Sequence, residues 1–375
     1  MRTLLLLPWF LFPATLFAET PMTADLTLIT DRLCLEALNA TRPIDIDRVR
    51  ADIDRQKEDG SWADIDYDGT SLTHWAPSGH LRRLLFFVRA YRTPGSALYD
   101  SVEVKDAILL GLAFWVKRDP QSDNWWSNVI GSPRSLGEVL LLMGADVPKD
   151  LVAGADPLIR RSGFTRTGAN LVWEASNLLT WACVTSDDAL LREVVARIGD
   201  EIKITTDEGI QHDDSFYQHG PQNYALGYGR SFAFDITRIA VILGGTDFAF
   251  PEEKIRILSR FILDGQQWFV FGRQIDYHAM GREAFRGRPG RHNWNAVGLS
   301  VICENMASSD TSRAGQYDAF AARATGVDPA GSSGPLGTKH FWRSDTMVYR
   351  SRAWYASVRF HSTRTYAVET RGNRE

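Results

Sequence analysis

The sequence predicts a mainly α-helical protein whose helices form antiparallel hairpins, followed by a short β-rich segment. From about residue 24 to 325, apolar residues recur at helical spacing in about a dozen segments that are joined mostly by short turns. Sequential helices with short connections pack as antiparallel hairpins, and a dozen of them can form a solenoid or close into a toroid. No repeat of fixed period is present, so the solenoid is disfavoured.

Composition limits the classes of function. Hydrophobic residues make up 44% of the 375 residues, which allows a substantial core. The net charge of −4 gives no general attraction to nucleic acid or to an anionic membrane, so an anionic ligand must be held by local basic groups. The three cysteines, Cys34, Cys183 and Cys303, form no CxxC pair and are expected in the core rather than in a metal site. We expect no metal and no cofactor.

The first 18 residues are typical of a secretory signal peptide. Arg2 supplies a positive charge, an apolar run follows from residue 4 to 17, and Ala18 is a suitable cleavage position. The apolar run is short for a membrane span, and no later stretch is long and apolar enough. We therefore expect an exported protein, secreted or periplasmic, that is monomeric and not membrane-bound after cleavage.

The expected helices follow in order along the chain. The segment 104–118 is apolar with charged ends, and the segment 135–144 ends at a glycine, which is a natural helix stop. The further expected helices are 170–184, 188–202, 229–245, 252–269, 292–307 and 314–326.

The sequence changes character near residue 328. Residues 328–339 are rich in proline, glycine and serine and are expected to form a linker. In residues 340–375, "WYASVRFHSTRTYAVE" alternates with period two and predicts strands. Two or three strands do not fold alone, so either the chain is a fragment of a longer protein or the strands pack onto the helical domain, residues 19–327.

One polar and aromatic stretch, "HDDSFYQHGPQNYALGYG" at 212–229, interrupts the helical pattern. It carries His219 and Tyr228 nine residues apart, with three glycines that let the backbone bend. Converging polar groups backed by aromatic rings suit the lining of a ligand cleft. A lone histidine or tyrosine here would more often be structural.

Three other polar loops carry candidate residues. In "DNWWSN", the adjacent Trp125 and Trp126 cannot both face one helix core, so they either stack on sugar rings or wedge two helices apart. In "TRTGANLVW", Asn170 alone is most simply a helix N-cap. In "MGREAFRGRPGRHNW", Arg282 and Arg286 would share one helical face, whereas Arg288 and Arg291 are expected in a solvated cluster.

Taken together, the four loops resemble polysaccharide lyase family 8. The matching elements occur in family order: "NWWSNVIGSPRSLGEVLLLMG", "TGAN", "DDSFYQHGPQNYALGYG" and "GREAFR". The wording "QHGPQ" is most similar to the chondroitin AC lyase branch. The resemblance covers roughly residues 100 to 375 and implies an (α/α) toroid followed by the first strands of an antiparallel β-sandwich that the chain does not complete.

The resemblance also implies a reaction. Family members cleave a uronic-acid polysaccharide, such as a glycosaminoglycan, by β-elimination without a metal. Asn170 and His219 would neutralise the uronate carboxylate, and Tyr228 would be the base and then the acid. A tyrosine hydroxyl ordinarily ionises only near pH ~10, and the neighbouring Arg282 and Arg286 would favour its phenolate.

The resemblance assigns the substrate contacts as well. Trp125 and Trp126 would stack on sugars, with hydrogen bonds from Asn124 and from Gln222. A glutamate of the β domain, Glu369 or Glu375, would complete the site.

Two rival functions stay open at this point. A glycoside hydrolase on an α/α toroid needs two carboxylates about 5–10 Å apart, for which Asp276 and either Asp213 or Asp214 are candidates. A non-catalytic polysaccharide-binding protein would use the tryptophans and arginines without chemistry. The lyase accounts best for asparagine, histidine, tyrosine and arginine occurring together.

Overall fold

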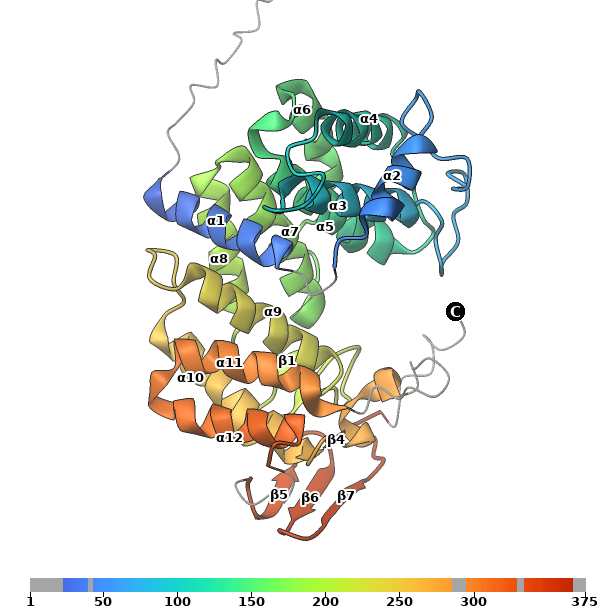
Figure 1. Ribbon diagram of the computed structural model, residues 1–375. Coiled ribbons are helices and arrows are strands. Elements are labelled where there is room, and N and C mark those ends of the chain that lie inside the picture. Colours follow the sequence, from blue (N-terminus) through green and yellow to red (C-terminus); the bar gives the residue numbers. More distant parts are fainter. Residues whose placement is uncertain (1–22, 40–42, 285–294, 329–333, 367–375) are drawn as a thin grey trace, which may run out of the picture.

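The computed structural model describes residues 23–39, 43–284, 295–328 and 334–366 (Figure 1). Twelve α-helices lie within these ranges. They are α1 Ala24–Leu38, α2 Ile46–Asp54, α3 Ser78–Arg92, α4 Val102–Arg118, α5 Ser132–Met143, α6 Lys149–Ile159, α7 Gly168–Thr185, α8 Asp188–Glu201, α9 Tyr228–Leu243, α10 Glu252–Arg260, α11 Leu299–Ser309 and α12 Ala314–Thr325.

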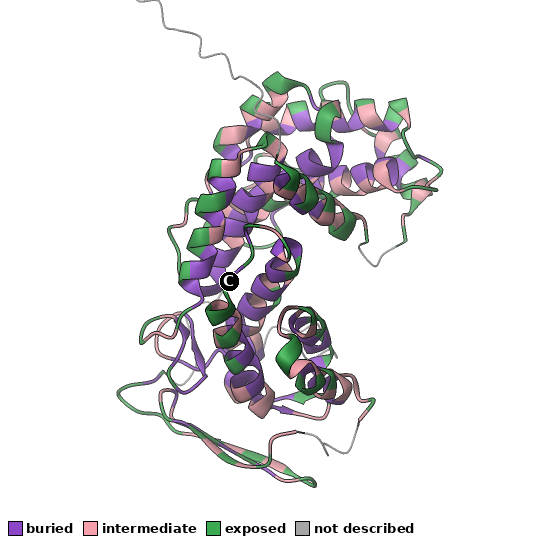
Figure 2. Cartoon of the chain, turned by 90° about the vertical axis from the view of Figure 1, so that its left-hand side faces the viewer, coloured by how far each residue is buried: buried purple, intermediate pink, exposed green. Residues whose placement is uncertain are grey.

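Alternate helices pack on one another to form the toroid. The helices α3, α5, α7, α9 and α11 contact one another in that order, and α4, α6, α8 and α12 lie against members of this series. Helix α1 crosses over α5, α7 and α9. Figure 2 shows that buried residues gather where helices face one another, and that the helices curve around an open side. The fold is therefore a mainly helical (α/α) toroid, as the sequence predicts.

Local chemistry sets the helix ends. Ser101 caps α4 by accepting a hydrogen bond from the backbone N–H of Val104, and Asp187 caps α8 in the same way. Asp119 ends α4 in the left-handed conformation (φ 44°). Helix α7 is buried along most of its length because α1, α5, α8 and α9 all pack against it. Its apolar sequence therefore reflects a central position in the toroid.

The expected helix in residues 252–269 is not one regular α-helix. It starts as α10, continues as a π-helical turn, η3 Phe261–Gly265, and ends as a 3₁₀ turn, η4 Gln266–Phe269. The change of winding coincides with Gly265, where a Cβ atom would clash with the backbone of Asp214. The apolar periodicity continues through this bend, so periodicity alone does not reveal it.

Three antiparallel strands follow the helices, in the order β5 Gly337–Phe341, β6 Thr346–Arg350 and β7 Tyr355–Arg359. In the register, His340 pairs with Met347, and Met347 pairs with Val358. Strand β5 begins inside the segment expected to be a linker, and residues 360–366 are not strand although their alternation predicts it. Two short hairpins, β1 Gly209–Ile210 with β2 Phe216–Tyr217 and β3 Val270–Phe271 with β4 Gln274–Ile275, lie among the helices.

The three-stranded sheet is anchored to the helical part by carboxylates. Asp213, Asp214 and Asp276 each bind one residue of the β-rich segment. The bonds are from the backbone N–H of Arg343 to Asp213 Oδ2 (2.5 Å), from Lys339 Nζ to Asp214 Oδ2 (2.7 Å) and from the Tyr355 hydroxyl to Asp276 Oδ2 (2.5 Å). The strands therefore pack onto the helical domain.

Candidate active site

His219 and Tyr228 lie together at the start of α9. The β1–β2 hairpin and the turns after it return the chain to Tyr228, the first residue of α9. His219 has a left-handed backbone (φ 56°), which is unusual for a residue with a side chain. Its ring meets the Tyr228 ring edge to face, with 4.7 Å between centroids. Tyr224, which is fully buried, packs edge to face against both rings at 6.2 and 5.2 Å.

Arg282 reaches the same tyrosine from a distant part of the chain. Its Nη2 donates a hydrogen bond to the Tyr228 hydroxyl oxygen at 2.7 Å, and its backbone N–H donates to the Tyr224 hydroxyl at 3.0 Å. Gly281 has a positive φ (53°), and a Cβ atom there would clash with the Tyr224 ring. Glycine at 281 thus allows the close approach that places the guanidinium on the phenol.

Asn170 lies in the first turn of the neighbouring helix α7. It is the third residue of the helix and therefore not an N-cap. The preceding Ala169 donates its backbone N–H to Gln218 Oε1 at 3.1 Å, which joins this turn to the residue next to His219. Asn170 is 7% exposed, and its Oδ1 accepts no hydrogen bond from any residue that the structure describes. A buried amide oxygen without a partner costs about 1–3 kcal/mol, which is tolerated where a ligand hydroxyl donates the missing bond while the amide N–H groups stay able to donate to the ligand.

The tryptophan pair is not on a loop, as expected from the sequence, but at the start of a helical segment that runs directly into a π-helical turn, η1 Ser127–Gly131. Trp125 and Trp126 are 39% and 37% exposed, which is high for indole side chains and leaves ring surface accessible to a ligand. Asn124 lies beside them, but its side-chain amide already makes hydrogen bonds to two backbone groups. Its Nδ2 donates to the carbonyl of Leu72 (3.0 Å), and its Oδ1 accepts from the N–H of Trp126 (3.1 Å).

Gln222 is buried and holds the loop. Its Nε2 donates to the backbone carbonyl of His219 at 3.2 Å. Its Oε1 is buried without a hydrogen-bond partner among the described residues. In this arrangement Gln222 shapes the His219 turn, and sugar binding through Gln222 stays a prediction.

Several predicted residues lie outside the described ranges. Arg286, Glu369 and Glu375 belong to this group, as do Arg288 and Arg291. Their expected roles therefore stay predictions.

The structure adds aromatic and basic residues that the sequence interpretation did not select. Trp173 lies between Trp126 (6.4 Å between ring centroids) and Tyr228 (5.9 Å). Arg134 lies over Trp173 with Cζ 5.9 Å from the centroid, and Arg166 lies over Trp125 at 4.0 Å. Trp173 is the aromatic residue of "LVWEASNLL", and the sequence could have indicated it. No local sequence pattern predicts which arginine contacts which tryptophan.

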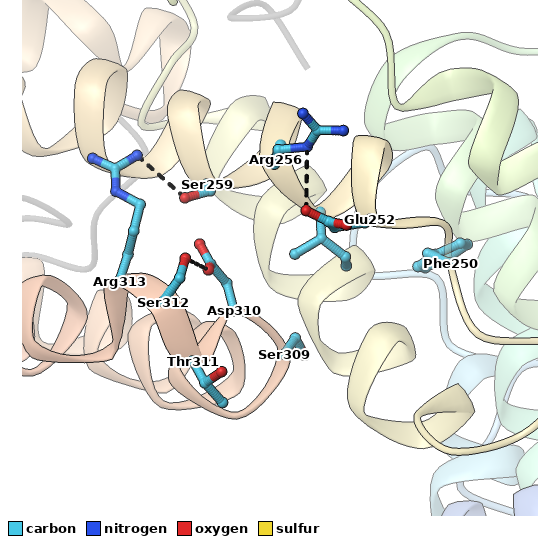
Figure 3. A pocket seen from close by; sticks show the side chains of 10 residues that line it. Phe250, Glu252, Arg256, Ser259, Ser309, Asp310, Thr311, Ser312 and Arg313 are labelled. Atoms are coloured by element: carbon cyan, nitrogen blue, oxygen red, sulfur yellow. Dashed lines mark hydrogen bonds and ion pairs between the residues drawn. The ribbon is translucent and has the colours of Figure 1, made fainter.

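Two cavities lie away from Tyr228. One, of about 680 Å³, lies between α10 and the turn after α11, and Figure 3 shows its lining side chains, including Arg256, Arg313 and Asp310. The other, of about 270 Å³, is lined by residues of α1, α3, α5, α7 and α9, including Arg134 and Asp235. Asp235 accepts a hydrogen bond from Trp173 Nε1 at 2.8 Å, so this second cavity borders the aromatic cluster beside Tyr228.

The described part of the chain shows no group of three or more histidine, cysteine, aspartate or glutamate side chains arranged to hold a metal ion. Among the same residues, no helix has the length and apolar character that a membrane span requires.

A family model for "Polysaccharide lyase family 8, N terminal alpha-helical domain" matches residues 44–319. Chondroitinase-AC of Pedobacter heparinus is 31% identical over 371 residues, which are 97% of this chain and 52% of that protein. Xanthan lyase of Bacillus sp. (strain GL1) is 25% identical over 296 residues, which are 76% of this chain and 30% of that protein.

A solved structure of chondroitinase AC lyase with oligosaccharides superposes with a TM-score of 0.84 at 28% identity, covering 92% of this chain and 51% of that chain. The chain thus spans about half the length of the chondroitinase that it matches. A xanthan lyase from Paenibacillus, at 19% identity and a TM-score of 0.70, shares the fold. The matched helical domain and its extent show that the chain belongs to polysaccharide lyase family 8.

Proposed function

We propose that this protein is an exported polysaccharide lyase that cleaves a uronic-acid-containing polysaccharide, such as a glycosaminoglycan, by β-elimination. The observation that carries the proposal is the 2.7 Å hydrogen bond between the Arg282 guanidinium and the Tyr228 hydroxyl, beside the ring of His219. A cation at this distance stabilises a phenolate, which is the form of tyrosine that removes a proton.

The chemistry assigns a role to each group. The Tyr228 phenolate takes the C5 proton of the uronate, and the electron pair moves into the carboxylate as an enolate. Asn170 and His219 would donate hydrogen bonds to that carboxylate and stabilise the charge that develops there. The pair then forms the C4–C5 double bond while the C4–O bond breaks, and the leaving oxygen takes the proton from Tyr228. Arg282 and Arg286 would hold that oxygen and the anionic chain.

The remaining residues would bind the polymer. Trp125 and Trp126 offer exposed indoles on which sugar rings would stack. Asn124 and Gln222 would hydrogen-bond to the sugars. Chondroitinase-AC and xanthan lyase among the relatives fit an anionic polysaccharide as the substrate class. We propose export to the periplasm or medium and a monomeric state.

The three aspartates that a glycoside hydrolase could use are engaged in contacts with other residues of the protein. Asp213 accepts hydrogen bonds from Ser215 and the Arg343 backbone, and Asp214 lies 2.6 Å from Arg260 Nε as well as 2.7 Å from Lys339. Asp276, the third candidate, accepts the Tyr355 hydroxyl hydrogen bond. These carboxylates join the helical domain to the β-rich segment, which argues against a role for them as general acid or base.

The test is an activity screen on the purified protein. Elimination leaves a conjugated C4–C5 double bond in the product, which absorbs in the ultraviolet, whereas hydrolysis adds water and leaves no such chromophore. We expect ultraviolet absorbance to rise with at least one polymer in a panel of uronic-acid polysaccharides. Chain shortening without an increase in absorbance would instead indicate a hydrolase, and binding without cleavage would indicate the non-catalytic alternative.

A further inference from the structure

One face of the Trp125 indole is covered by a positive charge. Arg166 Cζ lies 4.0 Å from the ring centroid, which is close for a cation–π contact. Trp125 comes from the helical start that leads into η1, whereas Arg166 comes from the loop before α7, four residues ahead of Asn170. Two segments far apart in the sequence therefore meet to put a guanidinium on an indole that is still 39% exposed.

The loop that carries Arg166 is held by two hydrogen bonds from residues that precede Arg166 in the chain. Ser162 Oγ donates to the carbonyl of Val129, within the turn that follows the tryptophans, at 2.6 Å. The backbone N–H of Thr165 donates to Glu174 Oε2 at 2.9 Å, and Glu174 is fully buried. Neither bond uses the Arg166 side chain. The loop leading to Arg166 is thus ordered before any ligand arrives, which lowers the entropy lost on binding.

The charge of Arg166 is only weakly neutralised. Its one ion pair among the described residues joins Nε to Glu174 Oε1 at 3.8 Å, near the outer limit for such a contact. The same Glu174 carboxylate already accepts two hydrogen bonds from Thr165, at 2.9 and 3.4 Å. The Arg166 side chain is 41% exposed, so its N–H donors are open to a ligand.

Arg134, which lies over Trp173 in the aromatic cluster beside Tyr228, has different surroundings. It shares its cavity with three carboxylates, those of Glu36, Glu138 and Asp235. An anion that approached Arg134 would meet these negative charges. Arg166 therefore is the better candidate of the two for binding an anionic group.

We propose that Arg166 and Trp125 form one subsite for an anionic sugar. The exposed face of the indole would stack on a sugar ring, and the guanidinium would bind an oxyanion substituent, a sulfate ester or a carboxylate, on that sugar or the next. The planar fork of arginine fits the oxygens of either group. This inference rests on the proposed function, since it takes the polysaccharide as the ligand, and it assigns Arg166 to recognition rather than to the elimination itself.

The experiment compares a sulfated uronic-acid polymer with the same polymer after chemical desulfation. KM and kcat are measured for the wild type, Arg166→Ala, Arg166→Lys and the control Arg160→Ala. Arg160 is a nearby surface arginine that pairs with Asp156 on α6 (2.7 Å). For Arg166→Ala we expect KM to rise by about tenfold with kcat little changed, because one charge-assisted bond is lost. Arg166→Lys should fall between alanine and wild type, and Arg160→Ala should match wild type.

The two polymers distinguish the two oxyanions. A rise in KM with the sulfated polymer alone identifies a sulfate ester as the ligand, and an equal rise with both identifies a carboxylate. Unchanged KM values for Arg166→Ala on both polymers would overturn the inference. So would a loss of kcat without a change in KM, because that would place Arg166 in the chemical step.

A binding measurement separates this inference from the proposed function. Calorimetric titration with oligosaccharides cut from the sulfated polymer reports affinity without turnover. If the wild type binds but cleaves no polymer, the lyase proposal fails, and weaker binding by Arg166→Ala still supports the subsite. Equal affinities for the wild type and Arg166→Ala would reject the subsite whether or not the enzyme is active. Near-ultraviolet circular dichroism of each variant verifies that the loop has kept its fold.

Discussion

At the scale of single residues, the proposed chemistry depends on the side chains that surround the Tyr228 hydroxyl. Tyr228 is 8% exposed, and it is enclosed by the rings of His219, Tyr224 and Trp173. Arg282 donates a hydrogen bond to its hydroxyl oxygen. A buried phenol next to a guanidinium can carry negative charge that it would not carry in an apolar core.

Removing this hydroxyl tests the assignment. Tyr228→Phe keeps the ring, so the edge-to-face contacts and the fold should survive, while kcat should fall by at least the 10²–10⁴-fold typical of a general acid–base group. The measurement is the initial rate of ultraviolet absorbance increase, with substrate affinity followed by calorimetry. Near-normal turnover by a well-folded phenylalanine variant would remove Tyr228 from the mechanism.

At the scale of elements, the helices were predictable because their signal is local. The segments 188–202 and 314–326 carry apolar residues at helical spacing, and α8 and α12 lie within a residue or so of those bounds. The proposed site was predictable only as a set of motifs, whose order along the chain resembles a known family. The contact of Arg166 with Trp125 joins residues 41 positions apart and depends on how a loop packs against a helical segment, which no local pattern encodes.

The joint between α3 and α4 contains a buried histidine that should make the protein acid-sensitive. His80 Nε2 lies 2.9 Å from the carbonyl of Gly111, which can only accept, so Nδ1 must accept the hydrogen bond of the Tyr67 hydroxyl, also at 2.9 Å. Burial lowers the pKa of His80 to about 4. The neutral ring is thus part of the native packing.

The sign of the pH dependence follows from this depressed pKa. The unfolded histidine titrates near its ordinary value of about 6.5, so the stability it contributes is present above that pH. It is lost as pH falls from about 6.5 to about 4, by roughly 3 kcal/mol in all. Denaturant unfolding at several pH values should show this loss in the wild type and in the control His74→Gln, where the histidine is exposed. His80→Gln should be less stable at neutral pH and lose less on acidification; a parallel loss in His80→Gln would contradict the assignment.

At the scale of the whole molecule, the β-rich segment and the toroid form one packed unit. Asp214 is nearly buried between Arg260 of α10 and Lys339 of β5. Lys339 also donates to the backbone carbonyl of Asp264. A buried carboxylate that loses one of its cations is left with an uncompensated desolvation cost.

Replacing that lysine should weaken the joint. We expect Lys339→Met to lower the free energy of unfolding by about 1–3 kcal/mol, because the bond to charged Asp214 is lost while Arg260 stays. The control is Lys105→Met, which removes a half-buried pair with Asp146 at 3.7 Å and should change stability by no more than about 1 kcal/mol. Equal effects of the two substitutions would mean that the sheet does not depend on this contact.

Charge over the whole protein gives a further prediction. The chain carries a net charge of −4, yet its proposed substrate is a polyanion, so binding must rely on local arginines. Their attraction is screened over a Debye length of about 8 Å at physiological ionic strength. We expect KM to rise with added salt while kcat changes less, and Arg286→Ala to flatten that dependence. Steady-state kinetics across a salt series provides the measurement, and a salt-independent KM would contradict the polyanion assignment.

The left-handed backbone of His219 has a consequence for how the sequence can vary. At φ 56° glycine is unstrained, whereas any residue with a Cβ atom carries a strain cost. Replacing His219 by glycine should therefore relieve this backbone strain even as it removes the imidazole that the proposed reaction needs. The fold thus bears backbone strain at a residue that the proposed reaction requires, and such strained residues cluster at functional sites.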